Sequence, residues 1–299
     1  MRFDGILFFP VTPFDATGRI DEELLAQHVR TGVEHSAGGI FPACGTGEFH
    51  ALSTAEAATV VRTAVTTVAG AVPVIAGAGG PLGHAIEVGR AAADAGADAL
   101  LVLPPYLVAG TQAGLVSYVE TIAAASDLPV IIYNRANGQF TPASVRRLAE
   151  NPRVVGFKDG AGDIGGAQLI VREVAKSGRD DFAFFNGLLT AELTQAAYRG
   201  IGIPLYSSAA FAMIPAVANA YYRAYTDGDE ARRLEILDGF YAPLVALRDE
   251  TPGFGVSLIK AGLRLQGLPV GSVRAPLVDP TPDQERRLAE ILAEGTALL

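Results

Sequence analysis

Cysteine and lysine are scarce in this sequence, and long hydrophobic runs are absent. Cys44 is the only cysteine among 299 residues, so no disulfide can form within the chain, and a reducing compartment is the simplest expectation. Apolar runs are interrupted by glycine, proline or charge well before the roughly 20 residues that a transmembrane helix needs. No signal-peptide pattern stands at the N-terminus. We therefore expect a cytoplasmic protein without a membrane partner.

An excess of basic charge is also lacking. The chain has 32 acidic and 23 basic residues, and its net charge is −9. This balance argues against a nucleic-acid partner, although a local site can still bind an anion. With 49% hydrophobic residues, the chain is long enough for a barrel of eight βα units, which needs about 250 residues, and for extra helices.

Eight short apolar runs alternate with longer amphipathic stretches along the sequence. Because the runs are apolar throughout, they predict parallel strands that are covered on both faces. We predict an α/β fold, a TIM (β/α)8 barrel over 1–227, with a C-terminal helical extension over 228–299 packed on it as a single structural unit. An open doubly wound sheet is the alternative. The runs are Ile6–Phe9, Gly39–Pro42, Val72–Ala76, Ala99–Leu103, Val130–Tyr133, Val154–Lys158, Phe182–Phe185 and Ile203–Tyr206.

Helix starts are predicted between these runs. Ser53 and Glu56 have the spacing of a capping box, and Pro142 after Thr141 occupies a first helical position. Further N-caps are expected at Asp21, Thr111 and Asp163.

Only three lysines occur, namely Lys158, Lys176 and Lys260. Lys176 closes a predicted helix, where a cation is favourable and remains in water. Lys260 lies in an amphipathic stretch, along which its stem can reach solvent. Lys158 differs because it ends an apolar strand, where lost hydration lowers the pKa of an amine. A neutral amine attacks ketones to form imines, so Lys158 is the candidate nucleophile. An ion pair with Asp159 is the alternative.

Two further groups follow predicted strands. Tyr133 ends the fifth strand, and adjacent strands of a barrel would bring it beside Lys158, where a phenol can relay protons. A structural tyrosine with a satisfied hydroxyl is the alternative. The segment 45–48 reads Gly-Thr-Gly-Glu, and glycine amides with a threonine hydroxyl suit a carboxylate ligand. A tight turn is the alternative there, and Glu48 could equally brace the loop or touch a substrate.

Several other motifs are rejected on their context. The segment 160–165 matches G-x-G-x-x-G but lacks the acidic residue expected about 20 positions later, so a dinucleotide site is not indicated. Cys44 follows apolar residues and is expected to be a buried small side chain. Ser207 and Ser208 lie outside a nucleophile-elbow motif. The histidines have no metal-ligand spacing, so no metal site is predicted, and they are His28, His35, His50 and His84.

At these positions the sequence resembles the class I lyase family of dihydrodipicolinate synthase and N-acetylneuraminate lyase. The resemblance covers nearly the whole chain and implies a TIM barrel, an imine-forming lysine, a small 2-oxo acid substrate, no cofactor and a homo-oligomer, commonly a tetramer. Matching motifs stand in order at five strand ends, and they are Phe9-Pro10-Val11-Thr12-Pro13-Phe14, Gly45-Thr46-Gly47-Glu48, Pro105-Tyr106, Tyr133-Asn134 and Phe157-Lys158-Asp159.

Carried over by position, the resemblance makes Lys158 the Schiff-base lysine and Tyr133 the proton relay. It places the substrate carboxylate on Thr46 and the neighbouring amides of Gly45 and Gly47. Arg135 could orient a distal carboxylate, with an ordinary surface or turn role as the alternative. Ser207 and Ser208 could bind the hydroxyls of the substrate, and an ordinary turn role is the alternative.

Departures from dihydrodipicolinate synthase indicate a different branch of the family. Gly45 replaces the first of its paired threonines, Leu107 replaces the second tyrosine of its Tyr-Tyr pair, and Gly138 stands where an arginine is expected. The sequence most resembles the branch that dehydrates and decarboxylates a deoxy-keto sugar diacid. The alternatives are an aldolase, lyase or synthase acting on another 2-oxo acid and a catalytically silent sensor barrel.

Overall fold

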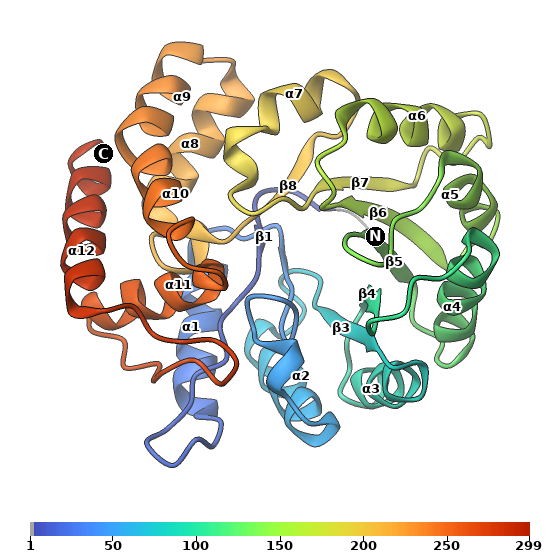
Figure 1. Cartoon of the computed structure of the whole chain (residues 1–299), viewed down its shortest axis with the longest axis horizontal. Helices are drawn as coiled ribbons and strands as arrows, with labels where there is room; N and C mark the ends of the chain where they lie inside the picture. Colours follow the sequence, from blue (N-terminus) through green and yellow to red (C-terminus); the bar gives the residue numbers. More distant parts are fainter. Residues whose placement is uncertain (1–2) are drawn as a thin grey trace.

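The computed structural model describes residues 3–299, and its centre is a parallel sheet of eight strands in the order β2-β1-β8-β7-β6-β5-β4-β3. A parallel bridge between Ile40 and Val74 joins β2 to the segment before β3, which brings the two ends of the sheet together. Figure 1 shows the helices arranged around this nearly closed barrel. The predicted TIM barrel is confirmed, and the open sheet is wrong. The strands are β1 (Leu7–Phe8), β2 (Gly39–Ile40), β3 (Ile75–Gly80), β4 (Ala99–Pro105), β5 (Val130–Asn134), β6 (Val154–Asp159), β7 (Ala183–Asn186) and β8 (Leu205–Ser208).

Every predicted apolar run overlaps one of these strands. The strands β3 and β8 continue past the predicted ends into Gly77–Gly80 and Ser207–Ser208. These residues are small or polar, so hydrophobicity alone does not mark them as strand. They stand at the carboxyl edge of the barrel, where Ser207 lines the cavity.

Helices α1 to α8 alternate with the strands, and α1, α2, α4, α5 and α6 begin where capping residues predict. Asp21, Thr111, Thr141 and Asp163 accept the expected backbone hydrogen bonds, and Ser53 forms the capping box with Glu56. No helix within residues 3–299 combines the length and hydrophobicity needed to cross a bilayer. The helices are α1 (Glu22–Glu34), α2 (Thr54–Val68), α3 (Leu82–Asp94), α4 (Gln112–Ala124), α5 (Pro142–Ala149), α6 (Ile164–Ala175), α7 (Gln195–Gly200) and α8 (Pro215–Asp227).

Side chains alternate across the barrel wall, as the pleat of a strand requires. Ile131 faces the interior, where it belongs to one buried cluster with Leu101 and Phe185. The next residue, Ile132, belongs to the larger cluster between the strands and the surrounding helices. Covering the sheet on both faces explains why the strands are apolar throughout.

The residues after α8 form a helical segment on one side of the barrel (Figure 1). It contains α9 (Glu230–Ile236), a π-helical turn η4 (Leu237–Tyr241), α10 (Ala242–Arg248), α11 (Phe254–Leu265) and α12 (Pro282–Ala297). Lys260 of α11 is 0% exposed and pairs with Glu48, so its predicted path to solvent is wrong. Phe14 and the segment around Ser272 cover this face of α11.

Candidate active site

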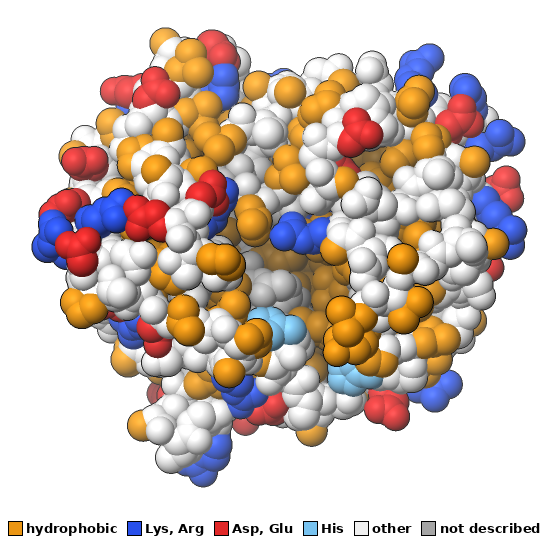
Figure 2. Space-filling view, in the orientation of Figure 1, with side chains coloured by type: hydrophobic (Ala, Val, Ile, Leu, Met, Phe, Trp, Pro, Cys, Tyr) orange, Lys and Arg blue, Asp and Glu red, His pale blue; other side chains and the backbone are white. Residues whose placement is uncertain are grey.

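A cavity of about 750 Å³ opens at the carboxyl-terminal ends of the barrel strands, where chemistry sits in this fold. Its walls come from strand ends, from the loops that follow them and from the segment between α10 and α11. Figure 2 shows a hollow in the middle of this face, with hydrophobic atoms on its walls and basic atoms beside it. The cavity is large enough for a small acidic substrate.

Lys158 ends β6 on the cavity wall, and its side chain is buried. Its Nζ lies 3.9 Å from the ring centroid of Tyr133 and 4.9 Å from that of Phe9. The same atom is 3.5 Å from the carbonyl oxygen of Gly187. An amine in this position is enclosed on the barrel side and accessible from the cavity.

Asp159 points to the opposite side of the strand from Lys158, so the ion pair between them that the sequence left open is wrong. Its carboxylate accepts hydrogen bonds from the Asn134 amide at 2.7 Å and from the Tyr198 hydroxyl. It also accepts the backbone N–H groups of Ala161 at 3.3 Å and Gly162 at 3.2 Å. These two amides belong to the rejected dinucleotide-like motif, and Asp159 occupies them.

Tyr133 lies in register with Lys158 on the adjacent strand, as predicted. Its hydroxyl donates to the Gly187 carbonyl at 3.0 Å and accepts from Arg135 Nη1 at 3.3 Å. Burial raises the pKa of Tyr133, but the positive charges of Lys158 and Arg135 outweigh it and hold the pKa below its usual value. A phenol with a lowered pKa is suited to exchange protons.

Two glycines leave room for this pair of side chains. A Cβ at Gly187 would lie 2.6 Å from Lys158 Nζ, and a Cβ at Gly160 would lie 2.8 Å from the Tyr133 ring. Any larger residue at either position would displace the amine or the phenol. Neither glycine is predicted as a site residue from the sequence, because only the close approach across strands makes them necessary.

Of the three residues expected to hold a carboxylate, Gly45 and Thr46 line the cavity. Gly47 does not, and its carbonyl accepts the Thr12 hydroxyl at 2.7 Å behind the loop. A Cβ at Gly47 would lie 3.1 Å from the Ala43 nitrogen, so this glycine permits the tight turn that the sequence offered as an alternative.

The two serines of β8 lie on opposite sides of the strand. Ser207 lines the cavity, while Ser208 accepts the Phe211 N–H at 3.1 Å on the far side of the strand. The expectation that both serines could reach a substrate hydroxyl therefore needs correction at Ser208. Successive residues of a strand face opposite sides, so only one of the two can line the cavity.

Arg135 lines the cavity from the loop after β5. Its backbone exchanges hydrogen bonds with Gly138 at 3.2 and 2.9 Å, which forms a tight turn. The guanidinium reaches back to the Tyr133 hydroxyl. The structure thus gives Arg135 a contact with Tyr133 that the sequence does not reveal.

Several cavity residues are missed by sequence reasoning. His50 lines the rim, as do Arg248, Asp249 and residues 251–256 between α10 and α11. Arg248 donates to the Thr190 hydroxyl at 2.6 Å. Apart from His50, which lies in the loop after β2, these residues follow no strand, so a search of barrel strand ends cannot find them. The only sequence feature that marks this segment is its loop-like composition around Pro252 and Gly253.

The remaining chemically active side chains lie away from the cavity or are inert. Burial raises the pKa of the Cys44 thiol to about 12, which confirms the prediction of a buried small side chain. Burial lowers the pKa of His28 to about 3, and its Nε2 accepts the Val11 N–H. Across residues 3–299, no three His, Cys, Asp or Glu side chains gather as a metal site requires.

A (β/α)8 barrel with a buried lysine and an adjacent tyrosine on the wall of a cavity at the carboxyl-terminal edge of its strands is typical of lyase-type enzymes that act on small molecules. The chain belongs to the dihydrodipicolinate synthetase family, whose model matches residues 2–295.

Known proteins support this membership over the full length. A probable 5-dehydro-4-deoxyglucarate dehydratase of Streptomyces griseus is 51% identical over 296 residues, covering 99% of this chain and 92% of the relative. Dihydrodipicolinate synthase from Oceanobacillus iheyensis superposes with a TM-score of 0.91 at 30% identity, covering 99% and 97% of the two chains. A prophage protein of the same family from Escherichia coli, solved with pyruvate, has a TM-score of 0.85 at 26% identity and covers 98% of each chain.

Proposed function

We propose that this enzyme converts 5-dehydro-4-deoxyglucarate to 2,5-dioxopentanoate, CO2 and water through a Schiff base on Lys158. The observation that carries the proposal is the pairing of Lys158 with Tyr133 at the cavity wall. The curated relative from Streptomyces griseus, which is named for this dehydratase activity, supports the choice of substrate.

The first half of the reaction forms the imine and removes water. Lys158 attacks the ketone carbon, and the carbonyl oxygen leaves as water, with the Tyr133 hydroxyl supplying and receiving protons. The iminium withdraws electrons and acidifies the adjacent CH2. Loss of that proton gives an enamine, whose electrons expel the β-hydroxyl as the water of dehydration.

The second half removes CO2 and releases the enzyme. Elimination leaves an iminium conjugated to a new carbon–carbon double bond. The distal carboxylate leaves as CO2, and the electron pair of its broken bond moves into this conjugated system. Protonation and tautomerisation turn the remaining hydroxyl-bearing carbon into an aldehyde. Hydrolysis of the imine then frees 2,5-dioxopentanoate and Lys158.

The other cavity residues would orient the substrate. Gly45 and Thr46 would hold the carboxylate beside the ketone, because both residues line the cavity and carry backbone amides and a hydroxyl that can donate hydrogen bonds. Arg135 would reach the distal, diacid end, and Ser207 would bind a hydroxyl.

We also propose that the enzyme works in the cytoplasm, in sugar-diacid catabolism, as a homo-oligomer. Tyr106, Leu107 and Val108 support an oligomer because they form a continuous apolar surface, with exposed fractions of 63%, 75% and 69%. Light scattering of the purified protein tests the oligomeric state, and a monomer at all concentrations would contradict it.

The test of the reaction is incubation with 5-dehydro-4-deoxyglucarate while CO2 and the semialdehyde product are measured. Equal amounts of the two products are expected. Release of pyruvate without CO2 would instead indicate an aldolase, and binding without any product would indicate a silent barrel.

A further inference from the structure

Lys260 of α11 and Glu48 of the β2–α2 loop form an ion pair that is withdrawn from solvent. Lys260 Nζ lies 2.6 Å from Glu48 Oε1, and both side chains are 0% exposed. Burial lowers the pKa of Lys260, and the negative charge of Glu48 opposes that shift. An apolar pair would be about as stable here, so stability alone does not explain the ion pair.

The segment after α11 completes the surroundings of this pair. The Lys260 ammonium also donates to the Ser272 carbonyl at 2.9 Å, and the Arg274 backbone N–H donates to Glu48 Oε2 at 2.7 Å. The Phe14 ring packs against both cations, and its centroid lies 4.1 Å from Lys260 Nζ and 4.0 Å from the Arg274 guanidinium carbon. The Glu48 carboxylate is thus held from two directions by the C-terminal segment.

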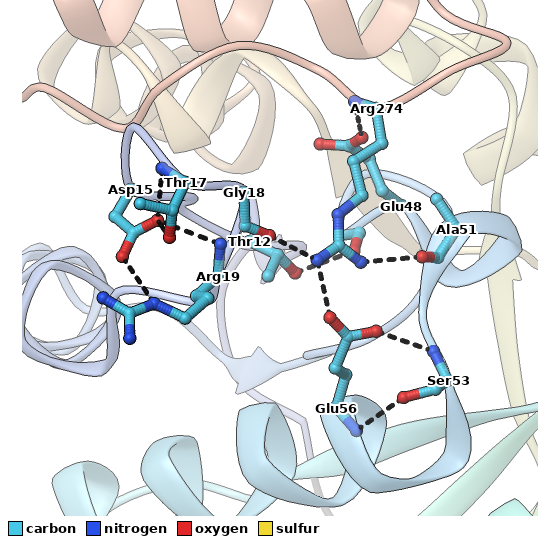
Figure 3. Close-up of polar contacts among 11 residues, drawn as sticks. Thr12, Asp15, Thr17, Gly18, Arg19, Glu48, Ala51, Ser53, Glu56 and Arg274 are labelled. Carbon is cyan, nitrogen blue, oxygen red and sulfur yellow. Dashed lines mark hydrogen bonds and ion pairs between the residues drawn. The ribbon is translucent and has the colours of Figure 1, made fainter.

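The Arg274 guanidinium also contacts the β2–α2 loop, as Figure 3 shows. Its guanidinium donates to the carbonyl oxygens of Gly18 at 2.7 Å and Ala51 at 2.8 Å, and it pairs with Glu56 Oε1 at 2.5 Å. The pKa of Glu56 falls to about 2, chiefly because of the hydrogen bond from Arg274. Arg274 therefore joins the loop, at Ala51, to Gly18 and to Glu56 in the first turn of α2.

Glu48 connects these contacts directly to the cavity. Its backbone takes the left-handed conformation with φ of 60°, which residues with a Cβ rarely adopt without support from tertiary contacts. In this conformation its N–H donates to the Gly45 carbonyl at 3.1 Å, and the N–H of Phe49 donates to Cys44 at 3.1 Å. These bonds set the shape of the turn whose Gly45 and Thr46 line the cavity.

We propose that Lys260 and Glu48 are positioning residues, and that their ion pair holds the Gly45–Thr46 turn in the shape that binds the carboxylate of a 2-oxo acid. The inference rests on the proposed function, since it assigns the carboxylate to this turn. Neither residue touches the substrate. The C-terminal segment thereby sets the affinity of the barrel for its ligand.

The experiment measures how much pyruvate is needed to trap half of the enzyme with borohydride. Lys260→Met should raise this concentration by about tenfold or more, the effect expected when the turn loses a hydrogen bond to the charged carboxylate of pyruvate. Full trapping should still be reached at saturating pyruvate. Glu48→Gln should behave in the same way. The double variant has a neutral pair of similar size, and the amide oxygen of the introduced glutamine can still accept the Arg274 N–H. Its half-saturation should lie within about threefold of that of either single variant, because each single substitution already removes the same ion pair.

Lys176→Met is the matched control, because it makes the same substitution at an exposed lysine that caps α6. Its half-saturation should equal that of wild type. Equal values for Lys260→Met and Lys176→Met would overturn the proposal, and so would a double variant whose loss of affinity is the product of the two single losses, since the residues would then act independently. If Lys260→Met does not fold, Glu48→Gln and the double variant provide the same comparison.

Failure of the proposed function has a different signature. If wild-type enzyme is not trapped by pyruvate, the imine chemistry is wrong, and the positioning role is then tested by amide hydrogen exchange without ligand. Lys260→Met should increase exchange in residues 44–49 relative to Lys176→Met. Unchanged exchange there would show that the ion pair does not hold the turn.

Discussion

Lys158 and Tyr133 face each other across adjacent strands, with the amine 3.9 Å from the centre of the phenol ring. Both groups also contact the carbonyl oxygen of Gly187, so one backbone atom fixes the two side chains. In the proposed reaction, an amine and a phenol that are held against a common acceptor need little rearrangement when the imine forms.

Replacing Lys158 by alanine should abolish turnover, because no other lysine lines the cavity along residues 3–299. We expect a loss of at least about 10⁴-fold in kcat, as for other covalent nucleophiles. Mass spectrometry after borohydride reduction with substrate should find the adduct on Lys158 only. The control Lys176→Ala should retain full activity, and an adduct on Lys176 or Lys260 would refute the assignment.

Tyr133→Phe should slow catalysis by about 10²–10⁴-fold, the usual contribution of a general acid or base. Binding should change less, since the ring that lies beside Lys158 remains. Comparing kcat with KM separates the two effects. Tyr118→Phe is the control, because its hydroxyl also donates to a carbonyl oxygen, at 3.1 Å from Gly80, but away from the cavity lining. If both variants keep kcat within about twofold of wild type, another group carries the proton.

Arg135→Lys should raise KM for the diacid by about tenfold or more, because an ammonium cannot grip a carboxylate at two points as a guanidinium does. Trapping of pyruvate, which has no distal carboxylate, should be nearly unchanged. The exposed Arg146 provides the control variant Arg146→Lys. Equal losses for pyruvate and the diacid would mean that Arg135 acts through its contact with Tyr133 instead.

Glu192→Gln should remove a pH dependence of stability. Glu192 is fully buried near Ser208 and Tyr241, and burial raises its pKa from 4.5 to about 7. The native state binds its proton more tightly than the unfolded chain, so the wild type loses stability as pH rises from 4.5 through 7, by about 3 kcal/mol in total.

The variant lacks this titration. The difference between its unfolding free energy and that of wild type should therefore increase by about 3 kcal/mol between pH 4.5 and pH 8. Urea unfolding at several pH values measures the difference, and Glu294→Gln at an exposed position is the control. A difference that stays constant with pH would show that the pKa of Glu192 is the same in the folded and the unfolded chain.

Much of the fold and the centre of the site could be predicted. Apolar runs predicted eight strands, capping residues predicted helix starts, and strand adjacency predicted that Tyr133 lies beside Lys158. Each of these patterns involves residues close together in the sequence, and the barrel topology then places consecutive strands side by side. The Lys260 prediction failed because its amphipathic stretch gave no sign that a later segment of the chain would cover it.

The sequence by itself determined the eight βα units, the position of the only strand-ending lysine and the turn of glycines and threonine after the second strand, because each depends on residues close together in the chain. Only the tertiary structure decided which side chains line the cavity. Strand pleating divides Ser207 from Ser208, and the segment between α10 and α11 reaches the cavity from far along the chain. The same long-range packing joins Glu48 to Lys260 and Arg274, since a buried charge needs a partner and only the folded chain brings one within reach.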